Sequence, residues 1–295
     1  MRSPWRSCRP FFVRRYVEPS SVSKRRKVVI RMKFALQETL VPGKSFREKA
    51  ENAAAYGYEG LELNGDGLAG RVDEVKSALK ESGVSAACIC GGYKFAILDP
   101  DEADREQAKA QFKQLLALAS EVGADGVILV PIFGPPRLPD MTPWKTAVEL
   151  EEELLVDQLG ELTKYAGRQG SKVILEPLNR YETHLLNRLE QAVRVCERVG
   201  SPHMTVLADF FHMNIEEADI PRSIMDAAKW LGYVHLADSN RVVPGRGHTD
   251  FSSGIKALQE IDYDGWASLE CEVPGNPAES LVQSLRFIQS QKVGI

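Results

Sequence analysis

The sequence has no apolar run long enough to cross a membrane and no low-complexity tract. A membrane-spanning helix needs about 18 consecutive apolar residues, whereas a stretch such as 126–132 has only the length of a strand. With 43% hydrophobic and 26% charged residues, the 295-residue chain falls in the range of globular rather than disordered proteins. We therefore expect a folded protein with a sizeable core, no membrane contact and a cytoplasmic location.

Cysteine is also scarce. The five cysteines are an odd number in a long chain without a secretory signal, which argues against a disulfide scaffold and predicts reduced, mostly buried thiols. Cys88 and Cys90 alternate on one face of an expected strand, so we interpret them as small core side chains. A redox pair would need a helix N-terminus to activate its thiolate. Cys271 should point away from the strand face that carries Glu270.

Nucleotide-binding signatures are missing. No G-x-G-x-x-G motif follows the first expected strand, there is no P-loop, and Gly-Arg-Gly at 245–247 is too short to count as a fingerprint. The main competing architecture, a doubly wound open sheet that binds a dinucleotide, therefore loses its principal signal.

The net charge of −4 is the sum of two unlike parts. Residues 1–31 hold ten Lys or Arg and one acid, Glu18, so they carry +9 and the remaining residues carry −13. Such a segment is typical of an organelle transit peptide or a nucleic-acid arm. Because a strand-like run begins directly after Met32, we interpret residues 1–31 as a basic, disordered extension. The acidic remainder argues against binding to a phosphate backbone, so no nucleic-acid partner is expected.

From residue 32 onward, short apolar runs alternate with amphipathic helical stretches, the pattern of successive βα units around a parallel sheet. Eight runs are expected as strands: 33–38, 60–64, 85–90, 126–133, 172–179, 204–211, 233–238 and 266–273. Helical stretches include 45–56, 101–122, 148–167, 189–199 and 277–291. Eight such units match the usual (β/α)₈ barrel of about 250 residues. The sequence therefore predicts an α/β fold, a single (β/α)₈ TIM barrel over residues 32–295.

Ionisable side chains follow the apolar runs in the second half of the chain. Glu176, Asp209, His235 and Glu270 each come after consecutive buried-type residues on four successive expected strands. In a TIM barrel the strand ends meet at one mouth. Unpaired charges buried there would be costly, and a divalent cation would compensate the three carboxylates. The oxygen-rich set favours Mn²⁺, Mg²⁺ or Co²⁺, with Zn²⁺ or Fe²⁺ left open. The other histidines, His184, His203 and His248, are expected at the surface or in loops.

Four segments carry a resemblance to a known family. Residues 176–187 (EPLNRYETHLLN), 209–217 (DFFHMNIEE), 235–241 (HLADSNR) with 244–251 (PGRGHTDF), and 268–270 (SLE) resemble the xylose-isomerase-like TIM barrel superfamily. Within it, the sequence is most similar to the ketose 3-epimerases of the D-tagatose 3-epimerase and D-psicose 3-epimerase group. The resemblance extends over residues 32–291 in element order, and residues 176–187 are the most diagnostic part.

The resemblance implies a metal-dependent sugar isomerase or epimerase that moves a proton at the carbon next to a ketose carbonyl, with the metal stabilising the enediolate. It assigns the metal to Glu176, Asp209, His235 and Glu270, and makes Glu176 and Glu270 the acid/base pair. The substrate's carbonyl-end oxygens would be held by three further residues, Glu182, His212 and Arg241. The expected partner is a small sugar or polyol-derived ketone, with a homodimer or homotetramer as the assembly to test.

The first half of the chain departs from that group. The aromatic residues that its epimerases present after strands one and four are not obvious here, and Glu38, Arg137 and Trp144 occupy the region instead. These walls would select the sugar, so an inosose dehydratase-type lyase and a hydroxypyruvate isomerase stay open. A non-catalytic sugar-binding scaffold is disfavoured while all four metal-binding residues are present. An endonuclease IV-like hydrolase is disfavoured because all five histidines lie between 184 and 248.

Overall fold

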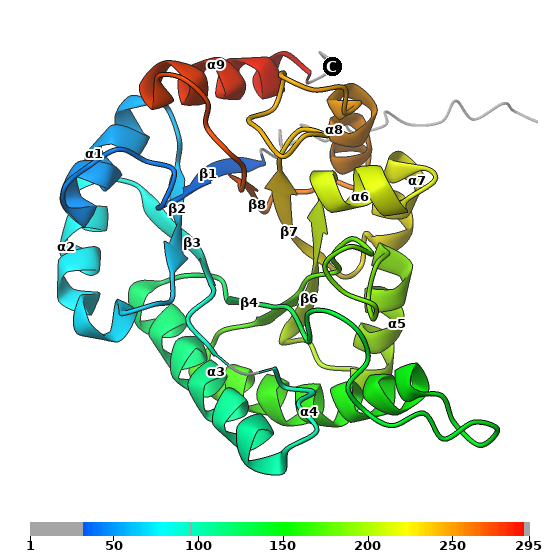
Figure 1. Ribbon diagram of the computed structural model, residues 1–295. Coiled ribbons are helices and arrows are strands. Elements are labelled where there is room, and N and C mark those ends of the chain that lie inside the picture. The colour runs from blue at the N-terminus through cyan, green and yellow to red at the C-terminus, as the bar shows by residue number, and fades with distance from the viewer. Residues whose placement is uncertain (1–31, 95, 292–295) are drawn as a thin grey trace, which may run out of the picture.

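The computed structural model describes residues 32–94 and 96–291. Within them, eight parallel strands close into a barrel in sequence order, and Figure 1 shows this barrel down its axis with the helices around it. The basic extension at 1–31 lies outside the described residues. The strands are β1 (Lys33–Gln37), β2 (Gly60–Asn64), β3 (Ser85–Cys90), β4 (Val127–Leu129), β5 (Val173–Leu175), β6 (Met204–Asp209), β7 (Leu231–Leu236) and β8 (Trp266–Leu269). The predicted single (β/α)₈ barrel is confirmed.

The helices of the described chain lie between the strands and after the last one. They are α1 (Phe46–Ala55), α2 (Val72–Ser82), α3 (Glu102–Val122), α4 (Ala147–Gln169), α5 (Leu189–Val199), α6 (Phe210–Glu216), α7 (Ile220–Ala227), α8 (Phe251–Glu260) and α9 (Pro277–Ser290), with a short 3₁₀ turn η1 (Leu68–Gly70) before α2. The predicted helical stretches match α1, α3, α4, α5 and α9 to within a few residues. Among these helices, none combines the length and apolar character that crossing a membrane requires.

Local sequence signals explain where the helices start and stop. Ser45, the predicted N-cap of α1, accepts a hydrogen bond from the backbone N–H of Glu48 at 3.2 Å. Thr146 and Glu149 form a reciprocal capping box at the start of α4. Such caps satisfy backbone donors that have no partner inside the helix. Four helices end at a glycine with positive φ, where a side chain would be strained: Gly83, Gly123, Gly170 and Gly200.

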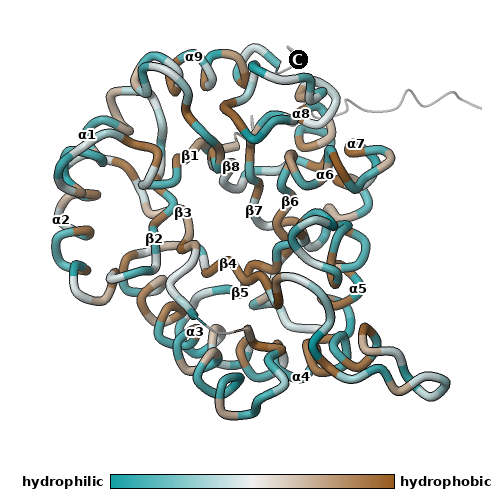
Figure 2. Tube along the Cα trace, viewed as in Figure 1, coloured by the Kyte–Doolittle hydropathy of each residue, from teal (hydrophilic) through white to brown (hydrophobic). Residues whose placement is uncertain are grey.

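Alternation along the strands divides the apolar residues between two cores. One group fills the barrel interior: Ala35, Ala87, Cys88, Ile128, Ile174, Leu207, Tyr233 and Trp266. The larger group lies between the strands and the helices, and Figure 2 shows the apolar character of β4 and β6 in this inner region. Cys90 packs against the interior group, whereas Cys271 packs against the outer one. The predicted packing of these cysteines is confirmed, and the four described cysteines are free thiols.

Three strands are clearly shorter than predicted. The apolar runs 126–133 and 172–179 form only three-residue strands, β4 and β5, and the run 266–273 forms only the four residues of β8. The chain then leaves the sheet to form the loops at the barrel mouth, where Gly134 pairs with Thr183 in an isolated bridge. Residues 210 and 211 similarly belong to α6 rather than β6. Val130, Ile132 and Leu178 are apolar and buried beyond the strand ends, whereas Phe133 is 54% exposed. An apolar run therefore does not by itself extend a strand.

Candidate active site

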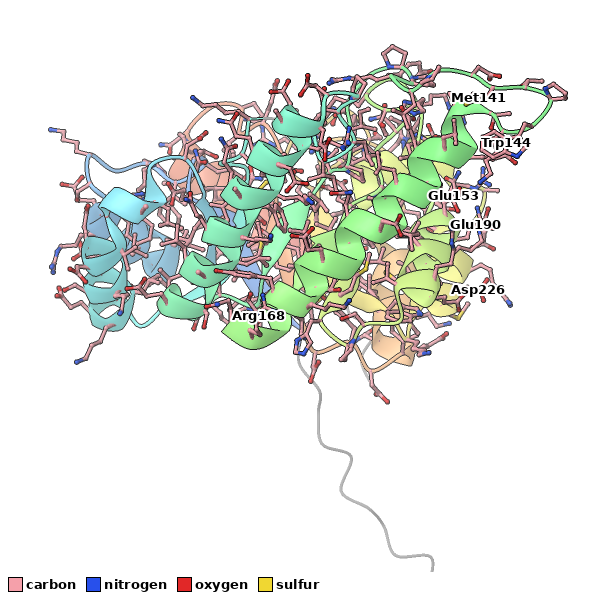
Figure 3. All side chains as sticks on the ribbon, turned by 90° about the horizontal axis from the view of Figure 1, so that it is seen from below. Met141, Trp144, Glu153, Arg168, Glu190 and Asp226 are labelled. Carbon is pink, nitrogen blue, oxygen red and sulfur yellow. The ribbon has the colours of Figure 1, made fainter. Side chains whose placement is uncertain are left out.

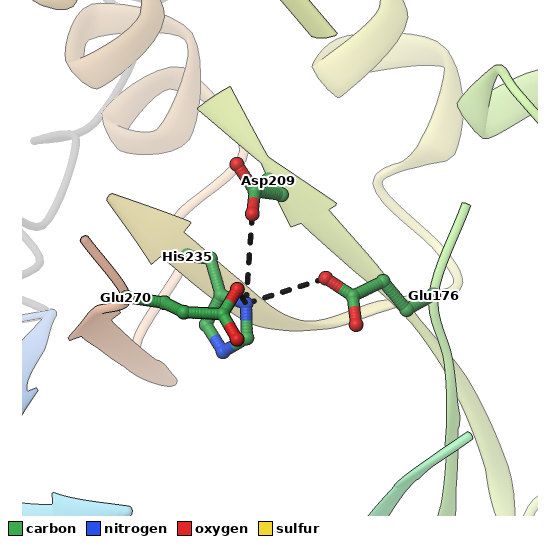
Figure 4. A group of neighbouring side chains, drawn as sticks. All are labelled: Glu176, Asp209, His235 and Glu270. Carbon is green, nitrogen blue, oxygen red and sulfur yellow. Dashed lines mark ion pairs between the residues drawn. The ribbon is translucent and has the colours of Figure 1, made fainter. Parts of the chain in front are cut away.

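Four strands deliver the predicted metal-binding residues to the mouth of the barrel. Glu176 directly follows β5, Asp209 ends β6, His235 lies near the end of β7, and Glu270 directly follows β8. The register of β6 with β7 places Asp209 beside His235. One donor atom from each residue lies within 4.8 Å of those from the other three. Figure 4 shows the three carboxylates converging on the imidazole.

His235 Nδ1 lies at the centre of this cluster. It is 3.0 Å from Glu270 Oε2, 3.3 Å from Glu176 Oε1 and 3.7 Å from Asp209 Oδ2. Both His235 Nδ1 and Glu176 Oε1 are buried without a hydrogen-bond partner. Buried polar atoms are rarely left unpaired in proteins. A divalent cation coordinated by three carboxylates and an imidazole would satisfy both atoms, so the donor set fits such an ion.

An outer layer of polar side chains fixes the orientation of the imidazole. Glu62, in β2, accepts a hydrogen bond from His235 Nε2 and one from Tyr233 Oη, both at 2.9 Å to its Oε2. Gln37 Nε2 donates at 2.8 Å to Glu62 Oε1 and at 2.8 Å to Glu270 Oε1. Because Nε2 donates its hydrogen bond to Glu62, Nδ1 is the ring nitrogen that faces the three carboxylates of the cluster. Glu62 and Gln37 are not among the residues predicted for the site, although an acid inside the apolar run 60–64 is unusual enough to indicate Glu62.

The buried charges shift one another's titration in opposite directions. Burial lowers the pKa of His235, but Glu62 and Glu270 outweigh it and raise that pKa well above its ordinary value. Burial raises the pKa of Glu176, and His235 only partly counteracts this. Burial also favours a higher pKa for Glu270, yet His235 and Arg241 bring it down to about 2. Two carboxyl groups with pKa values pushed apart are the usual arrangement of an acid and a base.

Arg241 lies over the cluster in a strained backbone conformation. Its φ is +60°, an uncommon value for a residue with a side chain and one that often marks a functional position. Nη1 donates to Asp209 Oδ2 at 2.8 Å and Nη2 donates to Glu270 Oε2 at 2.5 Å. The guanidinium also lies 4.7 Å from the centre of the Phe211 ring. The structure thus brings this predicted substrate-binding residue into direct contact with two of the predicted metal ligands.

The buried Asp238 carboxylate anchors the loop that carries Arg241. It accepts backbone N–H bonds from Ser239, Gly245, Arg246 and Thr249 at 2.8 to 3.0 Å. Burial would raise the pKa of Asp238, but these backbone donors outweigh it and lower that pKa. Asp238 lies in the segment 235–241, and the sequence alone predicts no role for it. Its role in the structure is to order the 239–249 loop over the mouth.

His212 and Glu182 lie beside Asp209, with His212 Nδ1 3.9 Å from Glu182 Oε1. Asn179 donates to His212 Nδ1 from its backbone N–H at 3.1 Å, with its side-chain nitrogen 2.8 Å from the same atom. Nδ1 is therefore the acceptor, and Nε2, 3.7 Å from Asp209 Oδ2, carries the proton. Asn179 Nδ2 also donates to Glu182 Oε1 at 2.9 Å. The Glu182 side chain is 43% exposed, which leaves it accessible to a ligand.

Comparison with known proteins agrees with this fold. Residues 50–291 match the family described as Xylose isomerase-like TIM barrel. The chain belongs to this family. The chain is 33% identical over 262 residues to 3-dehydro-D-guloside 4-epimerase of Escherichia coli K12, covering 88% of this chain and 100% of that protein. It is also 33% identical over 201 residues, about two thirds of each chain, to a ketose 3-epimerase of Arthrobacter globiformis.

A solved structure extends the similarity to three dimensions. The crystal structure of 3-keto-D-glucoside 4-epimerase from E. coli superimposes with a TM-score of 0.81 at 33% identity, over 88% of this chain and 100% of that one. The predicted family is confirmed. This structural similarity and the two relatives together show that the protein is an isomerase of the epimerase type.

Of the three residues expected to replace the missing aromatic walls of this xylose isomerase-like barrel, only Glu38 is buried. Glu38 pairs with Arg71 at 2.7 Å. Arg137 instead pairs with Asp99 at 3.0 Å. Trp144 is 68% exposed on the loop between β4 and α4, which projects to the edge of the molecule in Figures 1 and 3. Within this chain, Trp144 therefore does not line the mouth of the barrel.

The remaining histidines lie outside the cluster of metal-binding candidates. His248 is exposed in the loop after β7, and His203 is half-buried before β6. His184 is half-buried, lies 2.7 Å from the carbonyl oxygen of Gly134 and pairs with the buried Glu151 of α4. It therefore ties the loop after β5 to the loop after β4. Among the described residues, His235 is the histidine that joins a group able to hold a metal.

Proposed function

We propose that this chain is a divalent-metal-dependent epimerase that inverts a hydroxyl-bearing carbon next to a ketone of a sugar. The observation that carries this proposal is the cluster of Glu176, Asp209, His235 and Glu270, with two buried atoms that lack hydrogen-bond partners. These four residues would hold the ion, for which Mn²⁺, Co²⁺ and Mg²⁺ are the first candidates. When bound, the ion would withdraw charge from the substrate's carbonyl and hydroxyl oxygens.

Glu176 and Glu270 would exchange the proton. They follow β5 and β8, and Figure 4 shows both carboxyl groups beside the imidazole, 3.3 Å and 3.0 Å from its Nδ1. Inversion requires one group to remove the proton from one face of the carbon and another to return a proton to the opposite face. In one direction Glu270, whose pKa His235 and Arg241 lower, would be ionised and take the proton, and Glu176, whose pKa burial raises, would supply one. In the reverse direction the roles exchange.

Three further residues would hold the carbonyl end of the sugar. Arg241 and His212 Nε2 present N–H donors beside the cluster, so they can stabilise negative charge as it develops on the sugar oxygens. Glu182 is an acceptor for a hydroxyl at the open side. Asn179 positions both His212 and Glu182 and thereby sets the donor direction of the imidazole.

The names of the relatives support one reaction type on two substrates. In a 3-keto sugar, carbon 4 is next to the ketone, and in a 2-ketose, carbon 3 is. The E. coli and Arthrobacter relatives are named for inversion at these two positions. We propose a 3-keto glycoside as the first substrate to test, because the E. coli relative is matched over its whole length.

Deuterium incorporation tests this function directly. Metal-loaded protein is incubated in D₂O with 3-keto glycosides, 2-ketoses and inososes, and the products are read by NMR. We expect deuterium at the inverted carbon together with the epimer. Water release from an inosose would favour the lyase, and no reaction with any keto sugar would overturn the proposal.

The acid/base pair has its own test. Glu176→Gln and Glu270→Gln keep the side-chain shape but cannot exchange the proton, so each should lower kcat by about 100-fold or more. Calorimetry should show that sugar still binds to both metal-loaded variants. A variant with a normal rate would remove that residue from the mechanism.

A further inference from the structure

A glutamate lies on the buried face of helix α4. Glu151 is fully buried, one turn before Leu155, which packs in the core between the strands and the helices. Burial of an ionisable side chain on such a face is costly unless hydrogen bonds compensate it. Arg137 and Leu138 donate their backbone N–H groups to Oε1 at 2.7 and 3.2 Å, and His184 Nε2 contacts Oε2. The carboxylate therefore connects α4 to two loops, the one after β4 and the one after β5.

His184 carries this connection to the backbone of the loop after β4. Its side chain is 14% exposed. Ring Nδ1 lies 2.7 Å from Gly134 O, and the backbone N–H of His184 donates to the same oxygen at 3.2 Å. A carbonyl oxygen can only accept, so Nδ1 carries a hydrogen, and a second hydrogen lies between Nε2 and the Glu151 carboxylate. Both ring nitrogens are thus engaged in holding the two loops together.

The joined loops fix the backbone of Glu182. Gly134 donates its N–H to Glu182 O at 2.8 Å, and Gly134 also pairs with Thr183 in an isolated bridge. Thr183 Oγ1 donates to Ile132 O at 2.7 Å. On the other side, the backbone N–H of Glu182 donates to Asn179 O at 3.0 Å. The Glu182 backbone is therefore held from both sides, while its carboxylate is 43% exposed.

We propose that Glu151 is a positioning residue for the Glu182 carboxylate and acts through the His184 ring. The inference rests on the proposed function, in which Glu182 accepts a hydroxyl of the sugar. The hydrogen bonds run from Glu151 to His184, from the ring to Gly134 O, and from Gly134 N–H to Glu182 O. Binding groups are placed more precisely by helices and strands than by loops. The loop that carries Glu182 takes its position from α4, which is anchored in the core.

Two substitutions of Glu151 separate hydrogen bonding from packing. In Glu151→Gln, the amide oxygen still accepts from Arg137 and Leu138, and the NH₂ group donates to Nε2 of a neutral His184. Because every hydrogen bond is kept, we expect kcat/KM for the keto sugar to stay within about twofold of the wild type. Glu151→Met keeps the side-chain shape but offers no strong acceptor to the three groups that contacted the carboxylate.

Glu151→Met should affect sugar binding more than chemistry or the metal. We expect KM for the keto sugar to rise about 10-fold, as for loss of a binding contact, with a smaller change in kcat. The Mn²⁺ affinity should stay within about twofold, because Glu176 has its own backbone bond to Leu129 O of β4 at 3.0 Å. Calorimetry with Mn²⁺ and steady-state kinetics measure the two effects separately.

A double-mutant cycle tests whether Glu151 acts through Glu182. In a Glu182→Ala background, Glu151→Met should raise KM by less than about twofold further, because the group that it positions is gone. Amide hydrogen exchange followed by NMR gives a readout that needs no activity. The Gly134 N–H, which donates to Glu182 O, should exchange about 10-fold faster in Glu151→Met and at the wild-type rate in Glu151→Gln.

The matched control is Thr163→Val on the same helix. Thr163 is buried and its Oγ1 donates to Leu159 O at 2.7 Å within α4. This variant should lower the melting temperature without changing KM or the exchange of Gly134. If Glu151→Met does not fold, His184→Phe breaks the same hydrogen bonds at a half-buried loop side chain and should give the same rise in KM and in exchange.

Three results would overturn the positioning role. They are an equal rise in KM in both backgrounds of the cycle, a loss of Mn²⁺ affinity as large as the loss of sugar affinity, and unchanged Gly134 exchange in Glu151→Met. A wild type that turns over no keto sugar would instead overturn the proposed function. In that case the exchange rates still decide whether Glu151 holds the segment that carries Glu182.

Discussion

Replacing Glu62 by glutamine tests whether the outer layer builds the metal centre. The two oxygens of Glu62 serve three donors: His235 Nε2 and Tyr233 Oη at 2.9 Å each, and Gln37 Nε2 at 2.8 Å. A glutamine has one carbonyl oxygen and an NH₂ group that is itself a donor. At least one of the three donors would then face another donor in a fully buried position, and the negative charge opposite His235 would be lost.

The expected effect is a weaker metal site in a folded protein. Loss of a partner that orients a metal-binding histidine costs about 10- to 100-fold in metal affinity, which corresponds to about 1.4 to 2.8 kcal/mol. We expect Glu62→Gln to fall in this range because the ring loses the charged acceptor that holds Nδ1 toward the three carboxylates. Gln37, which also contacts Glu270 at 2.8 Å, would relay the disturbance to a second ligand.

Titration of the metal-free protein with Mn²⁺, followed by electron paramagnetic resonance and calorimetry, measures this directly. Tyr233→Phe is the matched control, because it removes one donor to the same oxygen and leaves the charge unchanged, and its effect should be smaller. A second control is Glu81→Gln, which removes an exposed carboxylate that pairs with Arg47. If Glu62→Gln melts like the wild type and binds Mn²⁺ with unchanged affinity, Glu62 does not position the ligand and the reasoning is wrong.

Two further predictions concern the loop that carries Arg241. Asp238→Asn should lower the free energy of unfolding by about 1–3 kcal/mol at pH 7. Because the folded pKa of Asp238 is lowered, its contribution is present above the unfolded value near 3.9 and is lost as the pH falls through the folded value. The difference between wild type and variant in urea unfolding should therefore shrink at low pH, and a constant difference would contradict this. Gly247→Ala would place a Cβ 2.3 Å from Asp238 Oδ1. We therefore expect it to lower the free energy of unfolding by about 1–3 kcal/mol and to weaken sugar binding in calorimetry. The control Gly70→Ala, with open space around the added Cβ, should show neither change.

The second half of the barrel could be predicted from sequence because its signals are local. An ionisable residue directly after an apolar run predicts a strand end, and in a closed parallel barrel all strand ends meet at one mouth. Glu176, Asp209, His235 and Glu270 each satisfy this rule, and the structure brings them together. Their spacing along the chain carried no information about the distances between them; the topology of the barrel supplied it.

The outer layer could not be predicted in the same way because its partners are remote in sequence. Glu62 lies within β2 rather than after it, and its partner His235 is 173 residues away. Whether such an acid points into the barrel depends on the register of β2 with its neighbours, which a one-residue shift would reverse. Strand length was similarly undetermined for β4 and β5, where apolar residues continue past the last strand pairing into the buried loops.

This division between the halves of the barrel bears on which carbon is inverted. The relatives are named for inversion at carbon 3 or carbon 4, and both positions are next to a ketone, so one acid/base pair serves either reaction. What must differ is how the sugar is placed along the mouth. A misplacement of about 1 Å can cost about 100-fold in rate, and neighbouring carbons are about 1.5 Å apart. The residues that select the carbon must therefore be held rigidly. We therefore propose that Glu176 and Glu270 supply the chemistry for either reaction, and that the residues holding the rest of the sugar decide which carbon comes between them.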